Sequence, residues 1–291
     1  MFSDLKLGVN VYGFYGFSTD FREWVAFIQS AEALGFDQMR LLDHVVGVPD
    51  MLFTDKSVLR ETFTFLAYLS GVTSRIHFTT GIVILPQRQT VLVAKQAAEI
   101  DIMSGGRLTL GVGLGYSERE YQALGADFKT RAQVFEEQIT LLRMLWTQNA
   151  VTFDGKYHTL DAVSLAPQPL QRPIPLFFGM GRTSAPIPPD VVLARCGRLA
   201  DGWLPLFEPD SDGRIALRKV HDAAREAGRD PHEIVLEMVL HIGDKKPEEI
   251  RDAVNIRRDF GASRINFFLN GQSAAEQMDE IKRLAEVLKL G

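Results

Sequence analysis

Cysteine is almost absent from this sequence, which has Cys196 as its one thiol in 291 residues. A single thiol cannot form an intrachain disulfide, and this favours a reducing compartment. We expect Cys196 to be a small buried apolar residue and not a nucleophile. No apolar run reaches the ~18 residues needed to span a bilayer, and the start MFSDLKLGVNVYGF lacks the features of a signal peptide. These absences predict a cytoplasmic protein without membrane contact.

Basic residues are not in excess, because 32 Lys and Arg face 37 Asp and Glu and give a net charge of −5. No global positive field would therefore draw the protein to nucleic acid. Metal-binding patterns such as HExxH, CxxC and paired histidines at i and i+4 are missing, so no metal site is expected. The GxSxG elbow of many hydrolases and the phosphate-binding GxxxxGK[ST] loop are missing too.

Short apolar runs alternate with amphipathic segments along almost the whole chain, which predicts a parallel sheet covered by helices. Eight such pairs, in a chain near the ~250 residues typical of the fold, predict an α/β (β/α)8 barrel that forms a single domain over 1–291. Residues 147–173, with a hairpin turning at Asp154-Gly155, are expected to form an insertion after the fourth helix. The expected strands are residues 5–13, 36–44, 75–85, 107–113, 175–181, 199–206, 233–243 and 262–270. The expected helices include residues 24–36, 61–74, 90–106, 130–146, 213–227, 247–261 and 273–289.

The fourth expected strand ends in a glycine-rich run, RLTLGVGLG, with Gly111, Gly113 and Gly115 at alternate positions. In a dinucleotide-binding βαβ unit such a loop opens a helix directly, and an acidic residue ends a second strand ~20 residues later. Here the next clear element is the helix from residue 130, and no strand is expected before residue 151. The run fits better at the carboxyl end of a barrel strand, where active sites are built. Without Cβ atoms, its backbone could approach a flat ring or a phosphate.

Several longer motifs, in a consistent order, resemble the luciferase-like family of flavin and deazaflavin oxidoreductases. The resemblance covers nearly the whole chain, and it implies a (β/α)8 barrel that binds the deazaflavin F420, or alternatively FMN, at its carboxyl mouth. The motifs are AEALGFDQMRLLDH at 31–44, TTGIVILPQRQTVLVAKQAAEID at 79–101, GGRLTLGVGLGYSEREYQALG at 105–125, RAQVFEEQITLLRMLW at 131–146, FDGKYHTL at 153–160, APQPLQRPIPLFFG at 166–179 and RLADGWLPL at 198–206.

The resemblance also implies where the cofactor lies. In this family the ring lies over a non-proline cis peptide in a bulge of the third strand, which by position is Gly81-Ile82. The phosphate end of the cofactor lies near the loop after the fifth strand, where Arg182 could donate to it. The implied cofactor contacts are Asp43, Thr80, Gly81, Ile82, Leu114, Gly115, Arg119, Gly179, Met180, Gly181 and Arg182.

Asp43 and His44 end the second expected strand, where F420-dependent members of the family have the same pair. By resemblance, Asp43 would hold the ring edge or set the tautomer of its neighbour. His44 would be the general acid or base, since an imidazole has a reference pKa of ~6.5. The residues expected to line the substrate pocket are Tyr12, Phe14, Val48 and Tyr116. Val48 and Tyr116 replace a Trp and a Glu of the family's sugar-phosphate dehydrogenases, which argues against a sugar-phosphate substrate.

We therefore expect an oxidoreductase that transfers a hydride between F420 and a small organic substrate. By resemblance we also expect a homodimer. An FMN-dependent monooxygenase is the alternative within the family, because FMN members share most of these motifs. A barrel that has lost its cofactor and acts as a binding protein is a second alternative, since prolines alter the loop at 182–192.

Overall fold

Parallel strands close into a barrel in the computed structural model of the chain, which describes residues 2–11, 20–47 and 59–290. The strands follow the order β3-β2-β1-β11-β10-β9-β8-β5-β4, and β3 also pairs with β5, which closes the ring. β3 and β4 make up one of the eight staves, because both pair with β5. The closed parallel sheet confirms the expected (β/α)8 fold. The barrel strands are β1 Lys6–Val11, β2 Gln38–Leu41, β3 His77–Thr80, β4 Val83–Ile84, β5 Leu108–Gly113, β8 Leu176–Met180, β9 Gly202–Pro205, β10 Val235–His241 and β11 Arg264–Phe268.

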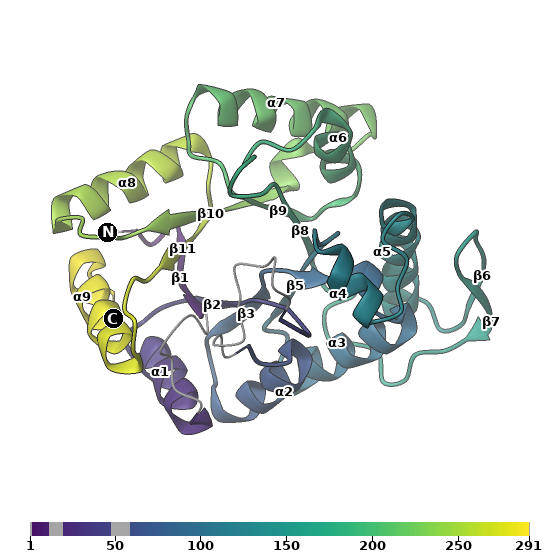
Figure 1. The fold of residues 1–291 in the computed structure, drawn as a ribbon, viewed down its shortest axis with the longest axis horizontal. Coiled ribbons are helices and arrows are strands. Elements are labelled where there is room, and N and C mark those ends of the chain that lie inside the picture. The colour runs from purple at the N-terminus through teal and green to yellow at the C-terminus, as the bar shows by residue number, and fades with distance from the viewer. Residues whose placement is uncertain (1, 12–19, 48–58, 291) are drawn as a thin grey trace.

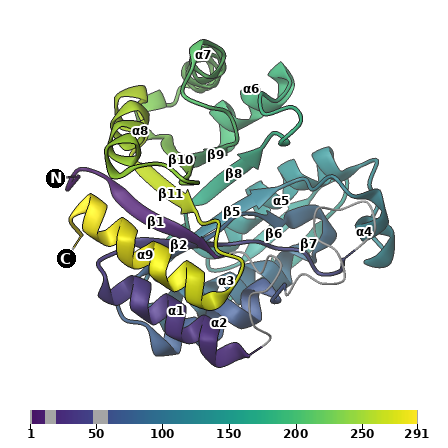
Figure 2. The same cartoon turned by 60° about the vertical axis from the view of Figure 1, so that its left-hand side comes forward.

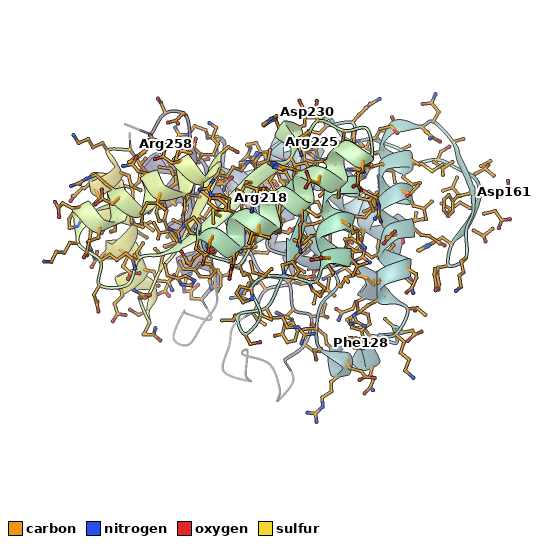
Figure 3. The ribbon with its side chains drawn as sticks, turned by 90° about the horizontal axis from the view of Figure 1, so that it is seen from above. Phe128, Asp161, Arg218, Arg225, Asp230 and Arg258 are labelled. Atoms are coloured by element: carbon orange, nitrogen blue, oxygen red, sulfur yellow. The ribbon has the colours of Figure 1, made fainter. Side chains whose placement is uncertain are left out.

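Helices surround the barrel (Figure 1), and α9 lies beside α1 (Figure 2). An antiparallel hairpin, β6 Val151–Asp154 and β7 Thr159–Val163, follows α5 as expected, and Figure 3 shows Asp161 of this hairpin at the side of the molecule. In the described part of the chain, no helix is both long and apolar enough to cross a bilayer. The helices are α1 Phe21–Ala33, α2 Thr62–Val72, α3 Thr90–Ser104, α4 Glu118–Ala123, α5 Arg131–Thr147, α6 Asp190–Leu199, α7 Ser211–Glu226, α8 Pro247–Phe260 and α9 Ala274–Leu288, with single 3-10 turns at Leu85–Gln87 and Pro231–Glu233.

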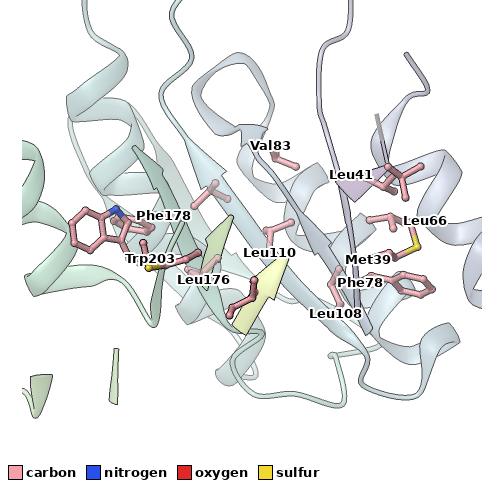
Figure 4. Packing of buried hydrophobic residues seen from close by; sticks show 14 of the residues in the cluster. Met39, Leu41, Leu66, Phe78, Val83, Leu108, Leu110, Leu176, Phe178 and Trp203 are labelled. Carbon is pink, nitrogen blue, oxygen red and sulfur yellow. The ribbon is translucent and has the colours of Figure 1, made fainter. Parts of the chain in front are cut away.

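The outward face of the barrel is apolar and packs beneath the helices. Met39 of β2 and Phe78 of β3 gather near Leu66 of α2, and Phe178 of β8 pairs with Trp203 of β9 (Figure 4). These side chains are almost completely removed from water, and this burial is the main driving force for assembling the helices on the sheet. Cys196 is part of the same apolar core, as expected.

The inward face of one half of the barrel is polar, whereas TIM barrels mostly fill their interior with branched apolar residues. Arg40 of β2 and Glu237 of β10 are both buried, with Arg40 Nη1 3.6 Å from Glu237 Oε1. Asn266 of β11 donates from Nδ2 to the same oxygen at 2.6 Å. A Cβ on Gly8 of β1 would collide with Asn266 and Gln38, so only glycine fits there.

The third stave was expected over 75–85 from its apolar pattern, with a bulge at Gly81-Ile82 from the family resemblance, and in the structure it is not continuous. It is split into β3 and β4 by a cis peptide between Gly81 and Ile82, and β4 runs into the 3-10 turn Leu85–Gln87. The cis bond lies where the family resemblance places it. A second difference is α4, a six-residue helix in a stretch for which no element was expected.

Candidate active site

The predicted site residues that the structure describes lie at or just after the carboxyl ends of β2, β3, β5 and β8. Ladders connect these strands through Leu41 and Thr80, Ile84 and Gly113, and Val112 and Phe178, so the segments that follow them are neighbours. The segments after β2, β5 and β8 include half-buried or exposed residues, such as His44, Tyr116 and Arg182. This is the end of a (β/α)8 barrel where enzymes build their active sites.

The glycines of β5 make room for the bulge of the third stave. A Cβ on Gly111 would overlap the carbonyl oxygen of Thr80, and one on Gly113 would lie 2.8 Å from Ile82 Cδ1. A Cβ on Gly179 of β8 would meet the same isoleucine from the other side. These glycines therefore make room for the bulge and for the half-buried Ile82 at the barrel mouth. The expected approach of the glycine backbone to a ligand stays a prediction.

Asp43 is held by three protein groups. Its carboxylate accepts from Arg88 Nη2 at 2.7 Å, from the Ile84 N–H at 3.1 Å and from Thr62 Oγ1 at 3.1 Å, and the residue is 3% exposed. None of these bonds goes to His44. Asp43 therefore fixes the segment after β2 to Ile84 of β4, and another carboxylate approaches His44.

That carboxylate is Glu120 of α4, which sequence reasoning missed. Both of its oxygens lie 3.3 Å from His44 Nδ1, and Oε1 also accepts from the Val45 N–H at 3.1 Å. Burial alone would raise the pKa of Glu120, but the hydrogen bond and charge of His44, together with hydrogen bonds from Gln87 and the Val45 N–H, outweigh burial and lower it. Glu120 is thus an anion, and a carboxylate at this distance favours the tautomer that carries a proton on His44 Nδ1.

The sequence contains a pattern that includes Glu120, but this pattern predicts a contact within its own helix. Ser117 and Glu120 form the S-x-x-E pattern of a capping box, and Ser117 Oγ does accept from the Glu120 N–H at 3.3 Å. The reciprocal half of the box is replaced, because the glutamate side chain turns to His44 and Val45 in the segment after β2. Only the fold reveals this contact.

Of the other predicted residues, Tyr116 lies beside His44. Its ring is 6.1 Å from the imidazole in an edge arrangement and is 40% exposed. Leu114 and Gly115 are half-buried next to it, and Arg119 is exposed on α4. Thr80 is fully buried and donates its hydroxyl to the Gly111 carbonyl at 2.7 Å, so its side chain supports the barrel.

The segment after β8 forms a closed turn. The Arg182 N–H donates to the Ala185 carbonyl at 3.0 Å and the Ala185 N–H donates back at 2.9 Å, so this backbone donor is used internally. Gly181 precedes it with a φ of +96°, where a Cβ would strike Pro186. The Arg182 side chain is exposed and makes no hydrogen bond or ion pair within the described part of the chain. Met180, at the end of β8, is half-buried.

Three predicted pocket residues, Tyr12, Phe14 and Val48, lie outside the described residues. Within the described ranges, no three His, Cys, Asp or Glu side chains come together in a group that could hold a metal ion.

The fold and the site define a (β/α)8 barrel with a cis-peptide bulge and a histidine–carboxylate pair at its carboxyl mouth. The sequence model of the luciferase-like monooxygenases matches residues 8–287, so the chain belongs to this family of oxidoreductases.

The relatives of the chain include proteins with a named activity and proteins without one. The chain is 33% identical over 230 residues to the uncharacterized protein Rv0940c of Mycobacterium tuberculosis, covering 74% of this chain and 76% of the relative. It is 30% identical over 227 residues to the F420-dependent hydroxymycolic acid dehydrogenase of the same organism, covering 76% of this chain and 59% of that protein. The crystal structure of monooxygenase RslO1 from Streptomyces bottropensis superposes with a TM-score of 0.80 at 20% identity, covering 98% and 99% of the two chains.

Proposed function

We propose that the chain is an F420-dependent oxidoreductase that exchanges a hydride with a small organic substrate, acting in the cytoplasm. The observation that carries the proposal is the pairing of His44 with the buried Glu120 beside the Gly81-Ile82 bulge. The relationship to the F420-dependent hydroxymycolic acid dehydrogenase supports this choice of cofactor.

The residues at the mouth fit such a cofactor. Gly81 and Ile82 present a half-buried backbone and an aliphatic side chain, which suit the face of a flat ring. Arg182 offers an exposed guanidinium without an anionic partner in the described chain, which suits a phosphate. Leu114, Gly115 and Arg119 would lie along the chain of the cofactor that joins ring and phosphate.

The chemistry divides between cofactor and protein. Bound F420 would supply the hydride acceptor or donor. His44 would accept or release the proton of the substrate at Nε2, while Glu120 keeps Nδ1 protonated and stabilises the imidazolium. Asp43 would act as a positioning residue, because it holds Ile84 and thereby the bulge that carries the ring.

An FMN-dependent monooxygenase is the second candidate, and the family's sequence model supports it. The same bulge would then carry the FMN ring, and the pocket would have to keep water from the reaction with O2. The alternative of a barrel without cofactor stays a prediction that the same experiment tests.

Fluorescence titrations of the purified protein with F420 and with FMN test the assignment. We expect micromolar binding of F420 and weak binding of FMN, with turnover of an alcohol, enone or nitro compound. In His44→Ala, F420 should still bind while turnover falls by ~10²-fold or more, and the surface variant His232→Ala should behave as wild type. Tight FMN binding with O2 consumption would favour the monooxygenase, and binding of neither cofactor would overturn both.

A further inference from the structure

A cavity with a volume of about 320 Å³ lies at the amino end of the barrel strands. Its lining includes the first residue of each of four adjacent strands, namely Lys6, Gln38, His77 and Arg264, together with Arg75 and the segment 35–37. Since all barrel strands are parallel, this amino end faces away from the candidate active site.

The lining carries more positive than negative charge. Lys6, Arg75 and Arg264 are cations, and Asp37 is the one carboxylate among the lining residues. Asp37 is already engaged, because its oxygens accept from Lys6 Nζ at 3.1 Å and from the Leu7 N–H at 2.9 Å. This positive lining stands out in a chain whose net charge is −5.

The barrel interior beneath the cavity has the same imbalance. Two guanidinium groups share the buried Glu237, with Arg40 Nη1 at 3.6 Å and Arg264 Nη1 at 3.9 Å from its oxygens. Neither distance is that of a hydrogen bond, and Asn266 already donates to the same carboxylate. Positive charge that is buried without a matching anion is unfavourable, and a bound anion would relieve it.

His77 responds to the same positive surroundings. Burial and the charges of Arg264, Arg107 and Lys6 lower the pKa of His77 to about 3, so its imidazole stays neutral near neutral pH. It is held by a bond of 2.8 Å between Nε2 and Thr109 Oγ1. His77 therefore adds a polar wall to the cavity without adding charge.

We propose that this cavity binds a small polyvalent oxyanion, a molecule with phosphate or carboxylate groups, between Lys6, Arg75 and Arg264. Guanidinium groups suit such ligands, because their donors match the spacing of the oxygens. The volume is in the range of small-molecule sites. A ligand bound here would stabilise the folded barrel without touching the catalytic mouth.

Calorimetric titration of the full chain with pyrophosphate and with citrate, at constant ionic strength and without cofactor, tests the proposal. We expect saturable binding of at least one of them at one site per chain. Arg75→Gln, which alters an exposed side chain that donates from Nη2 to the Glu32 carbonyl, should weaken binding at least tenfold while circular dichroism shows that the variant stays folded in the absence of anion. Lys6→Gln provides a second variant with the same expected direction.

Two matched arginine variants serve as controls. Arg225→Gln changes an exposed arginine on α7 and should leave binding unchanged. Arg182→Gln separates this site from the proposed cofactor site, whose ligand also carries a phosphate, and should leave binding unchanged as well. The proposal is overturned if neither anion saturates, if Arg75→Gln and Lys6→Gln both bind like wild type, or if Arg182→Gln abolishes binding.

Discussion

At the level of single residues, the proposed proton carrier depends on a carboxylate far away in the sequence. His44 follows β2, whereas Glu120 comes from α4, and their side chains meet in a nearly closed environment with 8% and 0% of each exposed. An ionised carboxylate in such surroundings acts strongly on its neighbour, because little water screens it. Glu120 is thus a positioning residue that should determine which nitrogen of His44 holds the proton.

Glu120→Gln tests this role with little change in shape. We expect kcat to fall by about 10- to 100-fold, because the amide cannot stabilise the imidazolium as the carboxylate does. The dissociation constant for F420 should stay within about threefold, and the imidazole ¹⁵N shifts of His44 should move toward the Nε2-protonated tautomer. Glu118→Gln, on the exposed face of the same helix, is the matched control. Unchanged ¹⁵N shifts and kcat would contradict the assignment.

Part of this site could be predicted from the sequence. The positions of Asp43 and His44 at the end of β2 were predicted, and the cis bond at Gly81-Ile82 is where the family resemblance places it. The partners of these residues could not be predicted, because Arg88 and Glu120 reach them only once separate strands are assembled. Long-range side-chain contacts leave no periodic pattern in a sequence.

At the level of elements, the alternate glycines of β5 and the bulge between β3 and β4 are one packing unit. Ile82 occupies the space that side chains at Gly113 and Gly179 would need. The glycine run was predicted to end a barrel strand at the mouth, and it does. The packing reason for these glycines could not be predicted, because it depends on the side chain of Ile82 in the neighbouring third stave.

Gly113→Ala tests the packing unit. The new methyl would lie 2.8 Å from Ile82 Cδ1 and 3.0 Å from the Gly179 carbonyl oxygen, so we expect a loss of about 1–3 kcal/mol in the free energy of unfolding. Adding Ile82→Ala removes the colliding side chain and should recover part of the loss. Denaturant unfolding of the two single variants and the double variant gives the coupling between the sites. Strictly additive effects would show that the two positions do not interact.

Most element positions followed from the apolar periodicity, since all eight expected strands correspond to barrel staves. The differences concern short elements. The split of the third stave and the helix α4 span only a few residues, where apolar spacing carries little information. The hairpin was predictable because Asp154-Gly155 is a strong turn signal between two β-type runs.

At the level of the whole molecule, apolar side chains remain exposed on the adjacent helices α2 and α3. Tyr68 of α2 is 51% exposed, and Leu92 and Met103 of α3 are 51% and 49% exposed. Leu92 and Met103 are separated by three helical turns and therefore share one face of α3. We propose that this face pairs with a second copy of the chain, in line with the homodimer expected by resemblance.

Light scattering coupled to gel filtration tests the pairing. We expect a dimer for the wild type and a monomer for the double variant Leu92→Glu/Met103→Glu, because four carboxylates would have to be buried in one symmetric interface. Ile256→Glu, which changes an equally exposed apolar residue on α8, should leave the dimer intact. A monomeric wild type at tens of micromolar, or a double variant that stays dimeric, would show that this face is not the interface. Retained F420 binding by the monomer would further show that each barrel builds its site from its own chain.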